Sequence, residues 1–302
     1  MSNQTNSMLN TAGNDMTGKP KILLILPAYN EEESIGAVLE SIREQHVDER
    51  MDVLVINDGS SDKTLEVAAS YGFEALSQVY NMGYGAALQT AYKYACDQNY
   101  DYLLQMDADG QHDLANLDLI LAKLLGEGGA AAACECAGEN DAAVAGEGAP
   151  VESDGSVNSS AATTKRTPDI VIGSRFLEGA QSFAISPVKK PVIAAFRGII
   201  TLTTKYKLTD PTSGLWGLNR AALEVFKKRN FFDVKYPDLN MILQMLLLGF
   251  HIEEIPAIMH ERSAGTSMHS GIGNALRYAV IMGLSTVGVL IRSRNMKAEM
   301  HG

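Results

Sequence analysis

The chain has 302 residues, of which 46% are hydrophobic and 20% are charged, so it is long enough for one large folded domain or two small ones. The formal net charge is −11, which argues against a general nucleic-acid-binding protein, because such proteins present a basic face to phosphates. Three cysteines are too few for a disulfide framework. We therefore expect a folded protein in a reducing, cytosolic setting that does not bind nucleic acid.

The two ends of the chain carry no clear targeting or membrane-spanning signal. Residues 1–20 are polar and lack the apolar segment of a secretory signal, so we expect a disordered tail there. A membrane-spanning helix needs about 18–20 apolar residues, and the run at 279–291 is too short for that.

The expected elements follow in chain order. An apolar run at 22–26, which Pro27 stops, predicts a buried parallel strand, and apolar residues at helical spacing from Ile35 to Ile42 predict a helix. The alternation that continues from there predicts an α/β fold with a mostly parallel sheet and right-handed crossovers. Further strands are expected at 53–56, within 73–79, at 102–106 and at 170–172, and further helices from Ser60 or Ser61 to Tyr71 and over 88–95.

Residues 126–168 interrupt this alternation. The segment is rich in Gly, Ala, Glu and Ser, and it holds seven acidic residues against two basic ones. Such a composition cannot bury enough apolar surface to fold, so we expect a disordered acidic insertion. Cys134 and Cys136 lie in it, without the partner ligands that a metal site needs.

The C-terminal part, residues 259–302, has the opposite charge balance. Apolar residues at helical spacing predict an amphipathic helix that ends at Arg292 and Arg294. Two interpretations stay open, which are a helix packed on the domain and an interfacial helix whose basic end contacts anionic lipid head groups. The residues that carry the pattern are Ile272, Leu276, Ala279, Val280, Gly283 and Val287.

Polar residues follow several expected strands, where ligands bind in open parallel sheets. Asp107 and Asp109 come directly after the strand at 102–106, with Gln111 two residues further on. The two carboxylates point the same way if this segment stays extended. Their oxygens suit Mg²⁺ or Mn²⁺, ions that keep open positions for water and substrate phosphates. An Asp-x-Asp sequence alone is often a surface turn, but its place after a buried strand makes a metal site our leading interpretation.

Seven short motifs between residues 21 and 267 form a set: Pro27–Glu31, Asn57–Ser60, Asn81–Gly85, Asp107–His112, Gly173–Arg175, Asp210–Gly214 and Arg262–Ser267. Together they resemble the motifs of family 2 glycosyltransferases, and more narrowly those of the branch that contains dolichyl-phosphate mannose synthases and polyprenyl-phosphate glycosyltransferases. The resemblance implies the GT-A fold, a Rossmann-like, mostly parallel sheet flanked by helices. It places this domain at 21–258, with an acceptor loop and a membrane-proximal C-terminal helix at 259–302.

The resemblance also implies roles for the matching residues. Asp107, Asp109 and Gln111 would hold Mg²⁺ or Mn²⁺ on the donor diphosphate, which makes Asp109 catalytic. Arg175 and Arg262 would contact phosphates, with Arg262 also catalytic, and an ordinary surface ion pair is the alternative for each arginine. Ser267 would lie at the acceptor, and the residues expected to bind the donor are Pro27, Ala28, Tyr29, Glu31, Asp58, Gly83 and Asp107.

Three features depart from this branch. Met268 and His269 follow Ser267, where the branch often has a lysine, so one contact to the acceptor phosphate is not matched. The long transmembrane tail of some relatives is absent, and the acidic insertion replaces a short connection.

The acceptor decides whether a base is needed. A lipid phosphate has a second pKa of ~6 and is already anionic at neutral pH, whereas a sugar hydroxyl needs a carboxylate base. Asp238 is the candidate base, and its alternative role is to cap the helix that starts near Leu239. Trp216 is a candidate neighbour of the donor sugar or a core residue.

We therefore expect an inverting, metal-dependent hexosyltransferase that moves a sugar from a nucleotide-sugar to a polyprenyl phosphate. Its expected place is the cytoplasmic membrane face, bound peripherally, with a small integral membrane protein as a candidate partner. The alternative is transfer to a saccharide hydroxyl in cell-surface polysaccharide assembly. A nucleotidyltransferase is disfavoured, because this chain has no Gly-rich, Lys-containing triphosphate loop after the first strand. A non-catalytic subunit that binds sugar nucleotide is disfavoured by the intact Asp58, Asp107 and Asp109.

Overall fold

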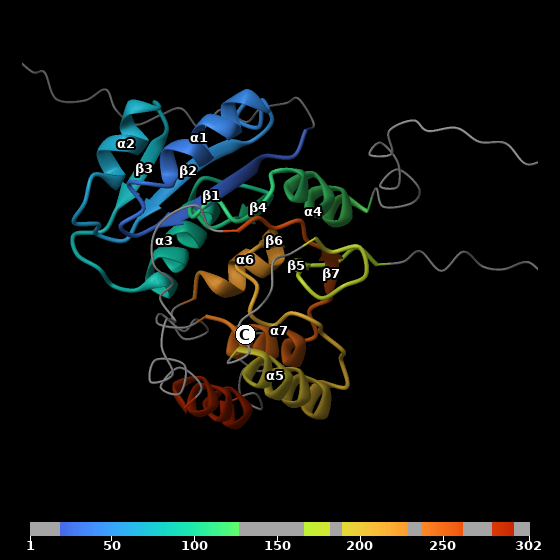
Figure 1. Ribbon diagram of the computed structural model, residues 1–302. Helices are drawn as coiled ribbons and strands as arrows, with labels where there is room; N and C mark the ends of the chain where they lie inside the picture. The colour runs from blue at the N-terminus through green and yellow to red at the C-terminus, as the bar shows by residue number, and fades with distance from the viewer. Residues whose placement is uncertain (1–18, 127–165, 182–188, 229–236, 262–279, 293–302) are drawn as a thin grey trace, which may run out of the picture.

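The computed structural model describes residues 19–126, 166–181, 189–228, 237–261 and 280–292. They contain a seven-stranded sheet with strand order β3-β2-β1-β4-β6-β5-β7 (Figure 1). The strands are β1 (Ile22–Ala28), β2 (Asp52–Asn57), β3 (Glu74–Ser77), β4 (Tyr102–Gln105), β5 (Ile170–Ser174), β6 (Trp216–Asn219) and β7 (Ile252–Pro256). The helices are α1 (Ile35–Glu44), α2 (Thr64–Ser70), α3 (Tyr84–Asp97), α4 (Ala115–Leu125), α5 (Lys189–Thr204), α6 (Arg220–Phe226) and α7 (Leu239–Leu248).

The sheet is mostly parallel, as the alternation of strands and helices predicts. β3, β2, β1 and β4 run parallel to one another, and β7 is parallel to β5. β6 runs antiparallel to both of its neighbours, β4 and β5. Because of this reversal, the chain enters β6 at the edge of the sheet where β4 and β5 end, and three loops meet there.

Helices cover both faces of the sheet. Along β1, Leu23 and Ile25 belong to one apolar cluster and Leu24 and Leu26 to the other, because successive strand residues point to opposite faces. The first cluster draws residues from α3, α5, α6 and α7, and the second from α1, α2 and α4. A strand buried on both faces is apolar at every position, which is why β1 stands out in the sequence as a continuous run.

Two of the expected boundaries are wrong. β1 does not stop at Pro27: its ladder with β2 continues through Ala28, whereas its ladder with β4 ends at Ile25. Pro27 therefore lies where the strand is paired on one side only, which a residue without an N–H tolerates. Helix α2 begins at Thr64 and neither Ser60 nor Ser61 caps it.

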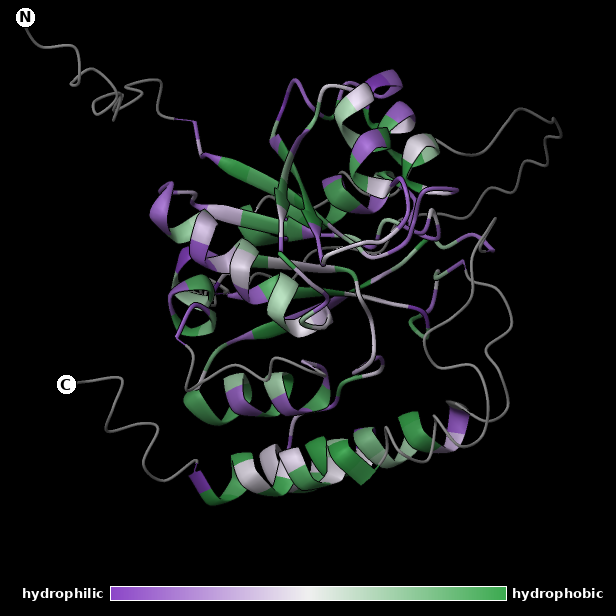
Figure 2. Ribbon diagram, turned by 90° about the vertical axis from the view of Figure 1, so that its left-hand side faces the viewer, coloured by the Kyte–Doolittle hydropathy of each residue, from purple (hydrophilic) through white to green (hydrophobic). Residues whose placement is uncertain are grey.

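Residues 280–292 form a helix that lies on the same side of the molecule as α5, beyond α7 (Figures 1 and 2). Met282, Thr286 and Val289 are buried, so one face of this helix packs on the domain. In the part of the chain that the structure describes, no helix is long and apolar enough to cross a membrane. The expected N-terminal tail up to residue 18 and residues 127–165 of the expected insertion lie outside the described residues, as do Ile272, Leu276, Ala279 and Arg294.

Candidate active site

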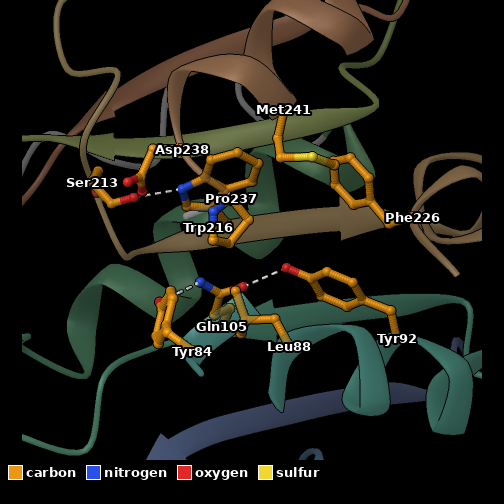
Figure 3. Close-up of a pocket in the computed structure, with 10 residues that line it drawn as sticks. All are labelled: Tyr84, Leu88, Tyr92, Gln105, Ser213, Trp216, Phe226, Pro237, Asp238 and Met241. Carbon is orange, nitrogen blue, oxygen red and sulfur yellow. Dashed lines mark hydrogen bonds between the residues drawn. The ribbon is translucent and has the colours of Figure 1, made fainter. Parts of the chain in front are cut away.

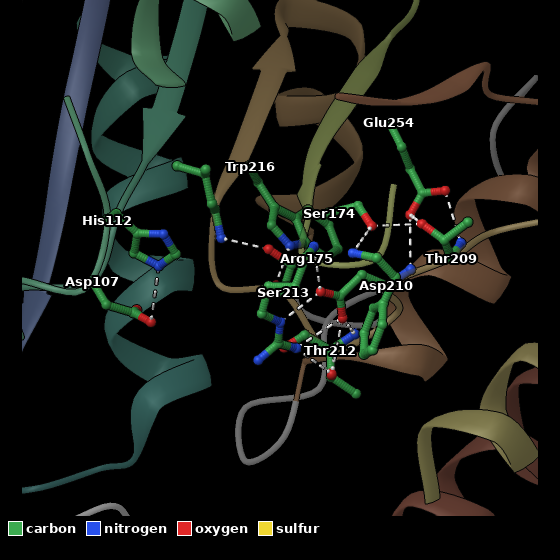
Figure 4. A network of polar contacts seen from close by, with 12 residues as sticks. Asp107, His112, Ser174, Arg175, Thr209, Asp210, Thr212, Ser213, Trp216 and Glu254 are labelled. Carbon is green, nitrogen blue, oxygen red and sulfur yellow. Dashed lines mark hydrogen bonds and ion pairs between the residues drawn. The ribbon is translucent and has the colours of Figure 1, made fainter. Parts of the chain in front are cut away.

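Polar side chains from four segments gather at the edge where β4 and β5 end. Asp107 follows β4, Arg175 follows β5, the loop at 210–215 leads into β6, and Asp238 directly precedes α7. Figure 4 shows Asp107, Arg175 and the loop before β6 at this edge. The topology therefore brings together residues that lie more than 100 positions apart in the sequence.

The two carboxylates after β4 sit in different surroundings. The segment does not stay extended, because Ala108 and Asp109 are in a turn, so the expected alignment of the two side chains by strand geometry is wrong. Asp109 is buried, and its Oδ1 accepts a hydrogen bond of 3.0 Å from the backbone N–H of Gln111. Asp107 is partly exposed, and its Oδ1 accepts a hydrogen bond of 3.1 Å from the hydroxyl of Tyr84. The turn thus places one carboxylate inside and one at the surface.

The second oxygen of Asp107 is confined as well. His112 Nε2 lies 3.8 Å from Oδ2, and a Cβ atom added at Gly214 would overlap the same oxygen. Glycine at this position therefore lets the loop before β6 come close to the carboxylate. Tyr84 therefore binds one oxygen of Asp107, and His112 and Gly214 leave the other little room, which restricts the side chain before any ligand binds.

The donor atoms of this site fit a hard divalent ion. Within the described residues, no group of three or more His, Cys, Asp or Glu side chains could hold a metal ion without help. Two carboxylates are what Mg²⁺ uses where water and substrate phosphates complete its shell. Asp107, the more exposed carboxylate, could therefore hold an ion that a substrate diphosphate also binds, whereas Asp109 and the side-chain amide of Gln111 stay predicted ligands.

Asp238 lies at the N-cap position of α7 but makes no side-chain capping hydrogen bond, so the capping alternative is wrong for this carboxylate. It lines a pocket together with Tyr84, Gln105 and Trp216 (Figure 3). Burial first, and then the charges of Asp107 and Asp238, raise the pKa of the Tyr84 hydroxyl well above its ordinary value. Asp238 is therefore within electrostatic reach of the Tyr84 hydroxyl, the group that binds Asp107.

Trp216 proves to be both buried and part of this pocket. Its indole Nε1 donates a hydrogen bond of 2.6 Å to the backbone oxygen of Ser213, which ties β6 to the loop that precedes it. The two alternatives for Trp216 are thus not exclusive, and contact with a sugar stays a prediction.

Arg175 forms a network with the loop before β6 (Figure 4). Its Nε and Nη2 donate to the two carboxylate oxygens of Asp210, which is fully buried, and Nη2 also donates to the hydroxyl of Thr212. Burial lowers the pKa of the guanidinium, but the hydrogen bonds and charge of Asp210 outweigh this effect and raise it. Asp210 is fully buried and only 16% of the Arg175 side chain is exposed, so the alternative of an ordinary surface ion pair is wrong. A direct phosphate contact by Arg175 stays a prediction.

Glu254 on β7 extends this network from the other side. Its carboxylate accepts hydrogen bonds from the backbone N–H groups of Thr209 and Asp210 and from the Thr209 hydroxyl. Burial raises its pKa, and the two backbone hydrogen bonds lower it in part. Glu254 thus anchors the start of the 210–215 loop, a role that sequence inspection missed.

The expected donor-binding residues lie at the ends of β1 and β2. Pro27 and Ala28 close β1 and are buried, whereas the Tyr29 side chain is exposed. Glu31 is tied to the next loop, because its backbone N–H donates to Thr64 Oγ1 at 2.8 Å. Its carboxylate accepts a hydrogen bond from Ser34. Their contacts with the donor stay predictions.

Ser60 and Ser61 tie the loops after β1 and β2 together instead of capping α2. The backbone N–H of Asn30 donates to Ser60 Oγ, and the backbone N–H of Ser61 donates to Asn30 Oδ1. Asn30 has a φ of +54°, a conformation that asparagine tolerates better than most residues. The two serines thus fix the shape of the edge where the donor is expected.

Asp58 binds the loop that leads into α3. Its two carboxylate oxygens accept hydrogen bonds of 2.9 Å from the backbone N–H groups of Met82 and Gly83. Burial raises its pKa, against the effect of these two bonds. Gly83 has a φ of +100°, which a residue with a side chain rarely adopts, so glycine is needed at this turn. Asp58 therefore holds two loops of the expected donor site in place.

Part of the expected site falls outside the described residues. Outside the described part of the chain lie Arg262, Ser267, Met268 and His269. Their expected roles at the acceptor therefore stay predictions. The preceding residues are described up to Glu261, and His260 Nε2 lies 2.9 Å from Asp113 Oδ2.

Comparison with known proteins identifies the family. The family model described as glycosyl transferase family 2 matches residues 23–146. Residues 23–146 therefore belong to a family 2 glycosyltransferase domain. It is 25% identical over 282 residues to the undecaprenyl-phosphate mannosyltransferase of Micrococcus luteus, a match that covers 91% of this chain and 98% of that one. The enzyme class expected from the motifs is thereby confirmed.

Other relatives differ in the share of this chain, and of their own length, that is aligned. The polyprenol monophosphomannose synthase of Mycolicibacterium smegmatis is 25% identical, over 83% of this chain and 82% of its own. A match of 34% identity to a Methanocaldococcus jannaschii protein covers 36% of this chain and less than half, 44%, of that protein. The expected resemblance to polyprenyl-phosphate glycosyltransferases is therefore confirmed over most of the chain.

Solved structures confirm the expected GT-A fold. Mannosyl-3-phosphoglycerate synthase from Rubrobacter xylanophilus matches with a TM-score of 0.54 and 16% identity, over 91% of this chain and 75% of that one. Glucosyl-3-phosphoglycerate synthase from Mycobacterium tuberculosis, in complex with Mn²⁺, uridine-diphosphate-glucose and phosphoglyceric acid, matches with a TM-score of 0.53 and 18% identity, over 91% and 79%. At this identity the likeness establishes the fold only.

Proposed function

We propose that this glycosyltransferase moves a sugar from a nucleotide-sugar to a polyprenyl phosphate and inverts the anomeric carbon. The observation that carries the proposal is the pair Asp107 and Asp109 at the end of β4, in a chain that matches an undecaprenyl-phosphate mannosyltransferase over 98% of that enzyme's length.

In this proposal the metal ion stabilises the leaving group, and residues of the protein position the donor. When bound by Asp107 and Asp109, with Gln111 as the predicted third ligand, Mg²⁺ or Mn²⁺ would neutralise charge on the leaving diphosphate. Asp58 and Gly83 keep the loop before α3 at the donor side, as their hydrogen bonds support. The acceptor phosphate is already anionic, so it attacks the anomeric carbon from the face opposite the diphosphate without a protein base.

We further propose that the enzyme binds the cytoplasmic face of the membrane through α5 and the helix at 280–292. Leu202 on α5 and Val280, Leu284, Val287 and Ile291 are 52–76% exposed, and the last four recur at helical spacing. Both helices lie at the same side of the molecule (Figures 1 and 2). Single exposed apolar residues are common, but a stripe of them is typical of interfaces and membrane surfaces.

Charge supports a lipid surface as the partner. Residues 189–209 and 280–292 contain no acidic residue, although the chain as a whole carries a net charge of −11. Lys190, Lys205, Lys207 and Arg292 are exposed in these two segments. An acceptor that is anchored in the bilayer requires that the active site come to the membrane, and anionic head groups favour such a basic surface. A small integral membrane protein remains the alternative partner.

One observation favours a second function, transfer to a saccharide hydroxyl. Asp238 faces the pocket beside Tyr84 and does not cap α7, so a carboxylate is present where a base for a hydroxyl acceptor would be needed (Figure 3). The full-length relatives weigh against this alternative, because both are named for polyprenyl substrates.

A donor and acceptor screen tests the proposal. Radiolabelled UDP- and GDP-sugars are incubated with the enzyme and either undecaprenyl phosphate or a soluble oligosaccharide, with Mn²⁺ or with EDTA. We expect label in the organic phase with undecaprenyl phosphate and Mn²⁺, and none with EDTA. Label that enters only the oligosaccharide would establish the alternative function instead.

A further inference from the structure

A chain of hydrogen bonds runs from the core of the domain to Asp107. The hydroxyl of Tyr92 donates to Gln105 Oε1 at 2.6 Å, and Gln105 Nε2 lies 3.0 Å from the hydroxyl of Tyr84. The Tyr84 hydroxyl in turn lies 3.1 Å from Asp107 Oδ1. Figure 3 shows the first two links between α3 and β4. Tyr92 and Gln105 are buried, so water cannot easily replace these partners.

The direction of this chain is fixed by one backbone oxygen. Gln105 Nε2 also donates to the carbonyl oxygen of Gly214 at 3.1 Å, and a carbonyl oxygen can only accept. The amide nitrogen of Gln105 must therefore point toward Gly214 and Tyr84, while its oxygen points toward Tyr92. Since the Tyr84 oxygen accepts from Gln105, its own proton is directed to the remaining partner, the carboxylate of Asp107.

We propose that Tyr84 is a positioning residue that holds the Asp107 carboxylate in its ion-binding orientation by donating its hydroxyl proton to Oδ1. The inference rests on the proposed metal-dependent transfer and adds a residue to it. Oδ2 is confined by Gly214 and His112, so the Tyr84 bond completes the restraint on both oxygens. Tyr84 opens α3 directly after Gly83, whose N–H is bound to Asp58, so the same turn connects the donor loop with the metal ligand.

Removing the hydroxyl should weaken ion binding and leave the fold intact. Outer-shell partners of metal ligands typically account for about 10–100-fold in metal affinity, and we expect a loss in this range for Tyr84→Phe. The control is Tyr100→Phe. Tyr100 is buried and its hydroxyl donates to Asp52 at 2.6 Å, the same kind of bond at the start of β2, away from the site.

The experiment measures free Mn²⁺ by electron paramagnetic resonance during titration of each full-length variant, with UDP or GDP in excess, and the melting temperature without metal. We expect a 10–100-fold higher Mn²⁺ dissociation constant for Tyr84→Phe, an unchanged constant for Tyr100→Phe and a folded protein in both cases. A purely structural tyrosine would alter the melting temperature and leave Mn²⁺ affinity unchanged, which overturns the inference.

Two further samples keep the result decisive. If Tyr84→Phe does not fold, Gln105→Leu removes the amide that directs the Tyr84 proton, and it should weaken Mn²⁺ binding by about 3–10-fold, less than loss of the hydroxyl itself. Unchanged affinity in that variant overturns the inference. Asp109→Ala separates the inference about Tyr84 from the proposed metal-dependent transfer. If Asp109→Ala loses Mn²⁺ binding and Tyr84→Phe keeps it, only the role of Tyr84 is contradicted. If the wild-type enzyme does not bind Mn²⁺, both proposals are contradicted.

Discussion

Arg175 and Asp210 form a bidentate ion pair, with Nε 2.6 Å from Oδ2 and Nη2 2.8 Å from Oδ1, that fastens the loop before β6 to the end of β5. Asp210 is fully buried. Removing one partner of a buried pair leaves an uncompensated charge, which costs about 3–5 kcal/mol. We therefore expect Asp210→Asn to lower the free energy of unfolding by about this amount, measured by urea denaturation.

The control for this prediction is an exposed pair. Arg220 pairs with Glu224 at 2.7 Å along α6, and Lys227 pairs with the same carboxylate at 2.6 Å, with about a third of each side chain exposed. Losing both pairs in Glu224→Gln should cost no more than about 1 kcal/mol. Equal effects of the two substitutions would contradict the anchoring role of Asp210.

The carboxylates after β4 give the second prediction. Asp109→Ala should reduce sugar transfer by roughly 10²-fold or more, because the ion on the donor diphosphate loses a ligand. Treatment of the wild-type enzyme with EDTA should have the same effect until Mn²⁺ or Mg²⁺ is restored. Initial rates with each metal check both statements, and full activity in a metal-free sample would rule out the proposed ion.

The expected insertion gives the third prediction. A Cβ atom at Gly126 would contact Thr167, so the two ends of this segment lie next to each other and a short linker can join them. Replacing residues 128–164 with a Gly/Ser linker should therefore shift the melting temperature by less than about 2 °C. Differential scanning calorimetry checks this, and a large decrease would mean that the segment contributes to the packed domain.

The membrane proposal gives the fourth prediction. The double change Leu284→Ser and Ile291→Ser removes two exposed apolar side chains, each worth about 1.5–3 kcal/mol when fully buried, so binding to anionic vesicles should fall at least tenfold. Binding should also weaken with added salt and in Arg292→Glu, because anionic lipid attracts the basic surface.

The matched control is Leu65→Ser, an exposed leucine on α2, whose helix packs on the other face of the sheet. Cosedimentation with phosphatidylglycerol vesicles measures all the variants. If neither the double change nor Arg292→Glu reduces vesicle binding, a partner protein is favoured as the membrane anchor.

Local pattern predicted the strands and helices of the first half of the chain well, because apolar runs and helical spacing follow directly from burial on two faces. It could not predict the antiparallel β6 or the start of α2. The reversal of β6 depends on pairing between strands more than 100 residues apart, and Ser60 and Ser61 bond to Asn30 on another loop. These are tertiary choices that no local spacing encodes.

The candidate site divides in the same way. The motifs pointed to Asp58, Asp107 and Asp109, since these residues lie in the segments that follow β2 and β4. Glu254 was missed because its partners lie 44 and 45 residues away. A local signal did exist for Gln105, a polar residue in an otherwise apolar buried strand, which is a position where a hydrogen-bonded role is expected.

The last prediction decides the acceptor. Arg262 is expected at the acceptor phosphate, and loss of one charge-assisted contact costs about 1.5–3 kcal/mol, so Arg262→Ala should lower use of undecaprenyl phosphate by roughly 10–100-fold. Nucleotide-sugar binding should stay almost unchanged. A hydroxyl acceptor needs a base instead, and Asp238→Asn would then lower transfer by about 10²–10⁴-fold. Both variants are measured with undecaprenyl phosphate at saturating Mn²⁺ and donor, after their melting temperatures show that they are folded. If Asp238→Asn abolishes transfer while Arg262→Ala matches the wild type, the lipid-phosphate proposal is wrong and the saccharide acceptor replaces it.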